Sequence, residues 1–182
     1  VGYMEPIYSL PCRMTSITRK NKDLFEHNSL SLFQKVSEIY KKYAPEEYTK
    51  QSEFIQNVNS NMVMPNTVFT TATVNVDFRT HTHTDQGDFR RGLGNLSVFQ
   101  QENKKPPLSG SEFLLPDYKI AFRLKEGDIL LVDVHAIHCN AEREGSGRIS
   151  LVLYARERLK KLCKNWSPTN LIEEKIEKRI LL

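Results

Sequence analysis

Two patterns of apolar and polar residues divide the chain, and the first of them is helical. In residues 28–43, NSLSLFQKVSEIYKKY, apolar side chains recur every three or four positions, at Leu32, Val36, Ile39 and Tyr43. This spacing predicts one buried helical face, with Asn28 or Ser29 as the cap. Pro45 ends that helix and stands in the first turn of a second one, predicted for PEEYTKQSEFIQNV, residues 45–58.

A β pattern replaces the helical one at Thr67. In TVFTTATVNVDFR, residues 67–79, side chains alternate, so that Val74, Val76 and Phe78 share one face and Asn75, Asp77 and Arg79 the other. Further strands are predicted for IAFRL, ILLVDV and RISLVLYAR, residues 120–124, 129–134 and 148–156. Short strands joined by glycine-containing turns indicate an antiparallel sandwich or barrel. QQENKKPPLSGSEF, residues 100–113, has the composition of a surface loop.

The order of the predicted elements favours a single α+β, mainly β domain over residues 1–182. A helical part covers about 1–66, a β-core about 67–157, and an amphipathic helix about 167–182, SPTNLIEEKIEKRILL. Helices at both ends of a block of strands pack most readily outside a β-core. A chain of 182 residues is long enough to bury such a core.

Composition narrows the class of protein only a little. Charged residues make up 26% of the chain and the net charge is +4, which by itself does not argue for nucleic acid. No apolar run approaches the roughly 18 residues of a membrane span, so we expect no membrane partner. The three cysteines, Cys12, Cys139 and Cys163, are scattered and form neither a disulfide framework nor a Cys-x-x-Cys metal pair. They favour a reducing, intracellular setting.

Two of the five histidines stand in RTHTHTDQGD, where they predict a metal site. Alternation would turn His83 and Asp85 to the same face of an extended chain. A third ligand, His138, would complete two histidines and one carboxylate, the facial triad of non-haem Fe(II) oxygenases. Two alternatives stay open: His81 in place of His83, as in a cupin-like manganese or zinc site, and His135 in place of His138.

Arg148, ten residues after His138, adds a second feature to this pattern. A 2-oxoglutarate oxygenase must hold the distal carboxylate of its cosubstrate, and a guanidinium does so with two parallel hydrogen bonds. Arg148 begins an apolar strand, so the order His-x-Asp, His and then Arg falls on predicted β elements. We therefore expect Fe(II) and 2-oxoglutarate as cofactors, with Arg143 or Arg156 as the other arginines able to take the anchoring role.

Three segments carry a resemblance to a known family: TVNVDFRTHTHTDQGDFRRGLGNLSVF, GDILLVDVHAIHCN and GRISLVLYARE. Over roughly residues 67–157 the chain resembles the TET/JBP family of DNA-modifying dioxygenases, and most closely the J-binding-protein thymine hydroxylase branch. The resemblance implies a double-stranded β-helix (jelly-roll) core. It implies that His83, Asp85 and His138 hold Fe(II), that Arg148 holds 2-oxoglutarate, and that the 5-methyl group of a pyrimidine in DNA is hydroxylated.

The same resemblance places base-reading roles on three residues. These are Asp88, Tyr154 as the stacking surface, and Arg156, which stands where the TET branch has histidine; Arg79 is a further substrate-binding candidate. Thymine is expected as the substrate ahead of 5-methylcytosine. Because a methyl group inside a base stack is out of reach, the target base must be flipped out or single-stranded.

Two other functions compete with this hypothesis. One is a 2-oxoglutarate oxygenase acting on a protein or small molecule, and the other is a catalytically inactive nucleic-acid-binding module. We expect a monomer inside the cell, in the nucleus of a eukaryote or the cytoplasm of a bacterium or phage.

Overall fold

A computed structural model of the chain describes residues 1–8, 11–21, 23, 25–104 and 109–167. The helical elements are α1 (Ser16–Lys20), the π-helical turn η1 (Phe25–Ser29), α3 (Leu30–Tyr43), α4 (Pro45–Ile55), the 3-10 turns η2 (Ser60–Met62) and η3 (Pro116–Tyr118), and α5 (Leu159–Leu162). The strands are β1 (Tyr3–Met4), β2 (Arg13–Met14), β3 (Thr71–Val76), β4 (Gly94–Gln100), β5 (Ser109–Gly110), β6 (Phe113–Leu115), β7 (Ile120–Phe122), β8 (Ile129–Val132), β9 (Cys139–Asn140), β10 (Arg143–Glu144) and β11 (Arg148–Tyr154).

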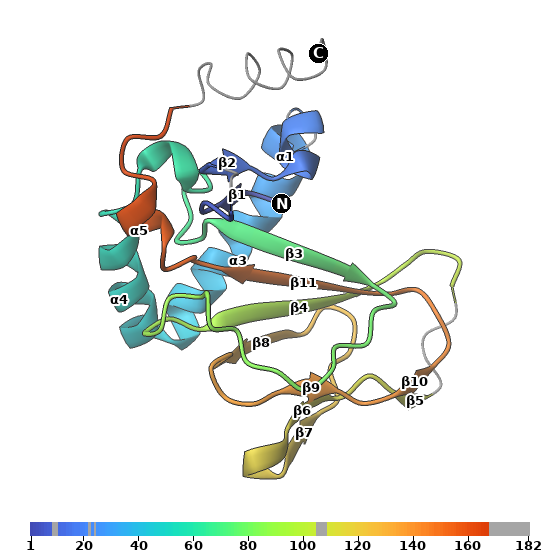
Figure 1. Cartoon of the computed structure of the whole chain (residues 1–182). Helices are drawn as coiled ribbons and strands as arrows, with labels where there is room; N and C mark the ends of the chain where they lie inside the picture. Colours follow the sequence, from blue (N-terminus) through green and yellow to red (C-terminus); the bar gives the residue numbers. More distant parts are fainter. Residues whose placement is uncertain (9–10, 22, 24, 105–108, 168–182) are drawn as a thin grey trace.

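Two antiparallel sheets form the centre of the molecule. The larger has the strand order β3-β11-β4-β8 and the smaller β7-β6-β9, and Figure 1 shows the smaller sheet below the larger one. The apolar side chains of Leu96 and Val132 from the larger sheet pack with Phe113 and Leu115 from the smaller. The chain is therefore a mixed α/β protein with antiparallel sheets, as the order of predicted elements implied.

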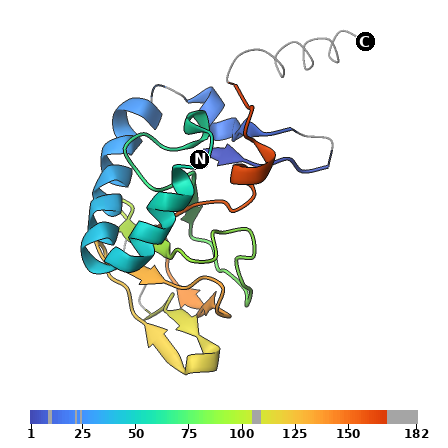
Figure 2. The ribbon, with the colours of Figure 1, turned by 90° about the vertical axis from the view of Figure 1, so that its left-hand side faces the viewer.

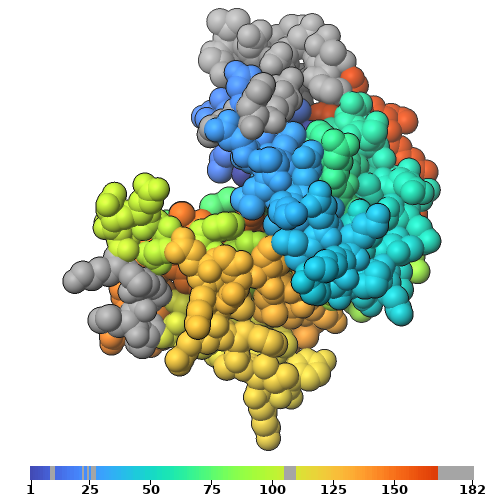
Figure 3. All heavy atoms as spheres, turned by 180° about the vertical axis from the view of Figure 1, so that it is seen from behind, coloured from blue at the N-terminus to red at the C-terminus, as the bar shows by residue number. Residues whose placement is uncertain are grey.

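Helices cover the other face of the larger sheet. Figure 2 shows α3 and α4 side by side, and Figure 3 shows both helices at the surface of the molecule as seen from behind. Phe33, Val36 and Tyr40 of α3 form one cluster with Leu151 and Leu153 of β11. Burying these side chains anchors the helices to the central strand, because each such residue contributes about 1.5–3 kcal/mol when removed from water.

The two predicted N-terminal helices are confirmed, but the buried face of the first was partly wrong. Leu32 and Tyr43 are exposed, and the buried positions of α3 are Phe33, Val36, Ser37 and Tyr40. Ser29 stands at the predicted cap position of α3, but its side chain makes no capping hydrogen bond. Ser29 ends the π-helical turn η1, which leaves it in a helical conformation instead of the extended one that a capping residue needs.

The sheet contains strands that the sequence analysis did not predict. β4 lies between β11 and β8. Asn95 and Ser97 alternate in it with Leu96 and Val98, a strand pattern that the prediction overlooked. Both faces of the strand are buried along most of its length. β5 lies in the segment predicted to be a surface loop, and it pairs with β10, for which no strand was predicted. The predicted C-terminal helix falls almost wholly in residues 168–182, outside the described part of the chain.

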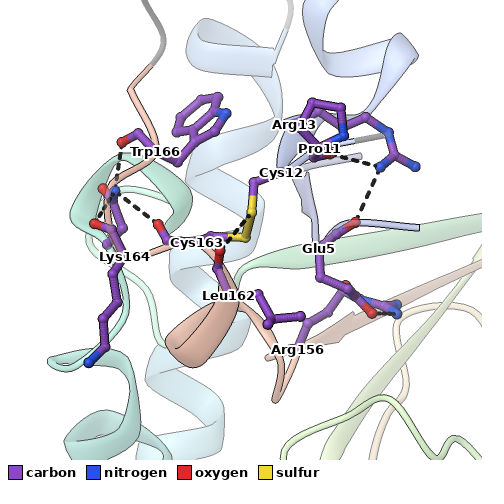
Figure 4. Close-up of a disulfide and its surroundings, with 10 residues drawn as sticks. Glu5, Pro11, Cys12, Arg13, Arg156, Leu162, Cys163, Lys164 and Trp166 are labelled. Atoms are coloured by element: carbon purple, nitrogen blue, oxygen red, sulfur yellow. Dashed lines mark hydrogen bonds and ion pairs between the residues drawn. A yellow bond between two sulfur atoms is a disulfide. The ribbon is translucent and has the colours of Figure 1, made fainter. Parts of the chain in front are cut away.

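The expectation that the cysteines remain unpaired is wrong. Cys12 and Cys163, which are 151 residues apart in sequence, form a disulfide, and Cys139 is free. The bond joins the β2 end of the N-terminal hairpin to the residue that follows α5 (Figure 4). Disulfides are rare in reducing compartments. The disulfide therefore removes the argument that the cysteines gave for a reducing, intracellular setting. The compartment itself stays a prediction.

We predict that the disulfide contributes substantially to stability. Closing a loop of this length restricts the unfolded chain by about 4–5 kcal/mol in the chain-entropy description, which corresponds to a decrease of roughly 10 °C or more in Tm when the bond is lost. Thermal unfolding of Cys12→Ser measures this, with Cys139→Ser as the control that removes the free thiol. A count of three free thiols in the unreduced wild type would contradict the prediction.

No helix in the described part of the chain is long and apolar enough to cross a membrane.

Candidate metal centre and substrate cavity

A cavity of about 360 Å³ opens between the two sheets. Alternate residues of β3 and β11 form one wall, including Thr73, Ser150 and Tyr154, and Phe113 of β6 lies in its lining as well. The segment between β3 and β4 contributes the polar side chains His83, Asp85 and Asp88, among others. Leu96, Val132 and Val152 add apolar lining, so the cavity combines apolar surface with convergent polar groups, the usual composition of a small-molecule or cofactor site.

Backbone pairing brings the two histidines together. The N–H groups of His83 and His138 each donate to the carbonyl oxygen of the other residue at 3.0 Å, and the N–H of Asp85 donates to Val134 at 2.9 Å. The continuous strand predicted through this segment is wrong, because β3 ends at Val76 and Asp77 has a φ of +53°. His83 nevertheless faces the cavity, through its isolated bridge to His138.

His83, Asp85 and His138 form a cluster that can hold a metal ion, with ligand atoms within 4.8 Å of one another. Nε2 of His83 lies 3.3 Å from one Asp85 oxygen and Nε2 of His138 lies 3.8 Å from the other. Nδ1 of His83 faces the carbonyl oxygen of His81 at 2.8 Å, and Nδ1 of His138 faces that of Ala136 at 2.9 Å. A carbonyl only accepts, so Nδ1 must donate, which leaves the Nε2 lone pair of each neutral imidazole for a metal.

The cluster is buried on one side and open on the other. His138 is 5% exposed and its ring stacks on Phe113, with the ring centroids 5.2 Å apart. The side chains of His83 and Asp85 are 37% and 35% exposed. A metal ion held by these three side chains would keep free positions toward the cavity, as a catalytic site requires.

The two alternative histidines lie outside this cluster. His81 is exposed and offers only its backbone carbonyl to His83. His135 pairs with Asp133 at 3.1 Å and with the backbone carbonyl of Asp88 at 3.3 Å. The geometry therefore favours His83 over His81 and His138 over His135.

Arg148 lies in the same cavity with unused hydrogen-bonding capacity. It is 8% exposed, and its buried Nη2 has no hydrogen-bond partner among the described residues. Burial, together with the nearby charge of Arg143, lowers the pKa of Arg148. A buried donor without a partner is costly, which indicates that an anionic ligand completes the site.

Asp77 explains how Arg148 is held in place. Its carboxylate accepts from the N–H groups of Gly147 and Arg148 at 2.7 and 2.9 Å and pairs with Arg143 at 2.8 Å. The pKa of Asp77 is lowered mainly by the N–H of Gly147. Asp77 therefore fixes the turn before β11. It does not pair with Arg79, which lies 3.4 Å from Glu142, outside the residues that line the cavity.

The three base-reading candidates all lie in the cavity. Asp88 and Arg156 are joined by an isolated β bridge, and the Tyr154 hydroxyl is 3.2 Å from that of Thr73. Burial, and secondarily the charge of Asp85, raises the pKa of Asp88 to about 8. At neutral pH most Asp88 side chains are thus protonated and can donate a hydrogen bond as well as accept one.

Sequence reasoning missed several residues at the site. Thr73, Asn75, Phe113 and Asn140 line the cavity. Thr73 and Asn75 could have been found from the alternation of side chains along β3, since they face the side opposite to the exposed Val74 and Val76. Glu5, at the other end of the chain, reaches Arg156, and no local sequence pattern indicates this contact.

Comparison with known proteins agrees with this geometry. The Tet_JBP family, described as the oxygenase domain of the 2OGFeDO superfamily, matches residues 3–157. The bifunctional helicase and thymine dioxygenase JBP2 of Leishmania braziliensis is 39% identical over 149 residues, which cover 80% of this chain and 13% of that protein. Thymine dioxygenase JBP1 of Trypanosoma brucei brucei is 35% identical over 161 residues, covering 82% and 18%. The chain thus spans less than a fifth of these curated relatives.

The fold has a counterpart among solved structures. The structure of NgTET1 in complex with 5mC DNA superposes with a TM-score of 0.71 and 14% sequence identity, covering 100% of this chain and 67% of that one. At this identity the likeness concerns the fold alone. The match over residues 3–157 and the identity to the trypanosomatid proteins show the family: the chain belongs to the TET/JBP family of Fe(II)- and 2-oxoglutarate-dependent dioxygenases.

Proposed function

We propose that this domain hydroxylates the 5-methyl group of thymine in DNA, giving 5-hydroxymethyluracil. The observation that carries the proposal is a single cavity that holds both the His83, Asp85 and His138 cluster and the unpartnered Nη2 of Arg148. The choice of thymine is supported by the relatives at 39% and 35% identity, which are thymine dioxygenases. In NgTET1, at 14% identity, the bound DNA contains 5mC.

The residues present fit both cofactors of the superfamily. Two imidazoles and one carboxylate are a ligand set that suits Fe(II), and they would hold it in the cavity. The unpartnered Nη2 of Arg148 fits a carboxylate of 2-oxoglutarate. Together, Fe(II), O₂ and 2-oxoglutarate supply the oxidising chemistry that removes hydrogen from an unactivated methyl group, with release of succinate and CO₂.

The chain's own residues bind and orient the base. Tyr154 provides an aromatic face for stacking, its hydroxyl held by Thr73. Asp88 and Arg156 lie at the same end of the cavity and offer polar groups to the edge of the base. Apolar side chains of Leu96, Val132 and Val134 line the wall and exclude water from the reacting methyl group.

The proposal extends to the substrate's conformation and to the fold. A cavity of about 360 Å³ admits one base and not a duplex, which supports a flipped or single-stranded target. The facing antiparallel sheets support a double-stranded β-helix core.

A monomeric state and an intracellular location stay predictions. The wholly buried Nη2 of Arg148 favours an active oxygenase over an inactive binding module, because a pure DNA-binding surface has no use for it.

We predict that the protein forms 5-hydroxymethyluracil in DNA that contains both thymine and 5-methylcytosine. The test is incubation with Fe(II), 2-oxoglutarate and ascorbate, followed by digestion to nucleosides and mass spectrometry. Omission of 2-oxoglutarate is the control. Formation of 5-hydroxymethylcytosine alone would refute the thymine assignment. Succinate release with neither product would favour a protein or small-molecule substrate.

A further inference from the structure

A buried carboxylate from the N-terminus pairs with the arginine of the base-reading group. Glu5 is 3% exposed, and its two oxygens accept hydrogen bonds from Nε and Nη2 of Arg156, 151 residues away in sequence (Figure 4). Burial alone would raise the pKa of Glu5, but the hydrogen bonds from Arg156, the backbone N–H of Glu5 and the charges of Arg156 and Arg158 together outweigh it, and the pKa is lowered. The pair is therefore ionised at neutral pH.

The rest of the fold holds Glu5 firmly in this position. β1 pairs with β2, the Thr71 hydroxyl donates to the carbonyl oxygen of Tyr3 at 2.8 Å, and Nη1 of Arg13 donates to the carbonyl oxygen of Glu5 at 3.2 Å. The disulfide from Cys12 ties the same hairpin to the chain that follows Arg156. Glu5 is thus a rigid partner, and Arg156 takes its orientation from it.

Arg156 belongs to the cavity and Glu5 does not. The guanidinium lines the cavity and lies against Gly87, where an added Cβ would be only 3.1 Å from Nη2. Glu5 accepts from Nε and from one N–H of Nη2, and the guanidinium also interacts with the Tyr154 hydroxyl, so only the donors that remain face the cavity for a ligand. Arg156 can therefore offer the base donors only, in a fixed orientation.

We propose that Glu5 is a positioning residue that orients Arg156 to donate to a carbonyl oxygen of the target base. This inference rests on the proposed function, and it names the chemistry of recognition: donors suit thymine, which has carbonyl acceptors on both sides of N3. Asp88, which a β bridge joins to Arg156, is the other carboxyl group near this guanidinium, and the charge of Arg156 opposes the rise in the pKa of Asp88. Because Glu5 holds Nε and Nη2 of Arg156, it fixes which way the guanidinium points between these two groups.

Glu5→Gln tests the inference, because it keeps the size of the side chain and removes its charge. We expect kcat/KM for thymine-containing DNA to fall by roughly 10- to 100-fold, the range that follows a small misplacement of a binding group. Succinate release without DNA should be unchanged, since the iron ligands and Arg148 are untouched. Glu38→Gln is the matched control, because it removes the carboxylate of an exposed ion pair with Lys35.

A double-mutant cycle separates positioning from a merely structural role. If Glu5 acts through Arg156, Arg156→Gln combined with Glu5→Gln should lose no more kcat/KM for DNA than Arg156→Gln alone. Additive losses, or full activity of a folded Glu5→Gln protein, would overturn the inference. Failure of the wild type to form 5-hydroxymethyluracil would instead refute the proposed function, and thermal unfolding of each variant reports its fold.

Discussion

Asp85→Ala is expected to abolish both metal binding and turnover while leaving the fold intact. The Asp85 carboxylate is the only anionic member of the cluster, and its oxygens lie 3.3 and 3.8 Å from Nε2 of His83 and His138. Its loss leaves two neutral imidazoles facing a divalent cation. We expect affinity for Fe(II), or for Mn(II) as a redox-stable probe, to fall by more than roughly a hundredfold, since loss of an outer partner of a ligand alone costs 10–100-fold.

Matched pairs of variants make this prediction specific. Asp133→Ala removes a carboxylate that pairs with His135 outside the cluster, and it should bind metal normally. His83→Ala and His138→Ala should lose binding, whereas His81→Ala and His135→Ala should retain it. Calorimetric titration with Mn(II) measures binding independently of catalysis. Normal binding by His83→Ala together with loss in His81→Ala would move the site to the alternative that the sequence left open.

Local patterns were sufficient to predict β11 and the pair of His83 with Asp85, because those residues are close in sequence or follow one strand. His138 is far from that pair in sequence, and it was chosen over His135 by the order of the motifs and the resemblance to the family. Arg148, Tyr154 and Arg156 share a parity, and all three reach the cavity. Arg79 does not line the cavity, because β3 ends at Val76 and Asp77 with its positive φ redirects the chain. The alternation of side chains between two faces can be extrapolated only while the strand continues. The residues around Asp77 in the sequence do not show that its partners are Gly147 and Arg143.

Contacts between distant segments were beyond the reach of the sequence. The disulfide and the ion pair of Glu5 with Arg156 each join residues 151 apart. Both depend on the N-terminal hairpin lying beside the end of β11, which only the assembled fold determines.

Arg148→Met is expected to raise the KM for 2-oxoglutarate by roughly a hundredfold with a smaller change in kcat at saturation. Loss of charged hydrogen bonds to a carboxylate costs about 3 kcal/mol, and about 1.4 kcal/mol corresponds to each factor of ten. The methionine side chain fills similar space without leaving a buried charge. Steady-state succinate release at varied 2-oxoglutarate measures the effect, and binding of 2-oxoglutarate to the Mn(II)-loaded protein checks it without turnover.

Arg143 and Arg156 are the comparison for Arg148 as the anchor of 2-oxoglutarate, because each of them already has a carboxylate partner. Arg143 pairs with Asp77 and Arg156 with Glu5, whereas no ion pair of Arg148 is found among the described residues and its buried Nη2 has no partner there. Arg156→Gln should therefore leave the KM for 2-oxoglutarate near the wild-type value and affect DNA instead. An unchanged KM in Arg148→Met, with a raised KM in Arg143→Gln or Arg156→Gln, would assign the anchor to that residue. The cosubstrate would then have to displace Asp77 or Glu5 from a buried ion pair, a cost of several kcal/mol that Arg148 does not incur.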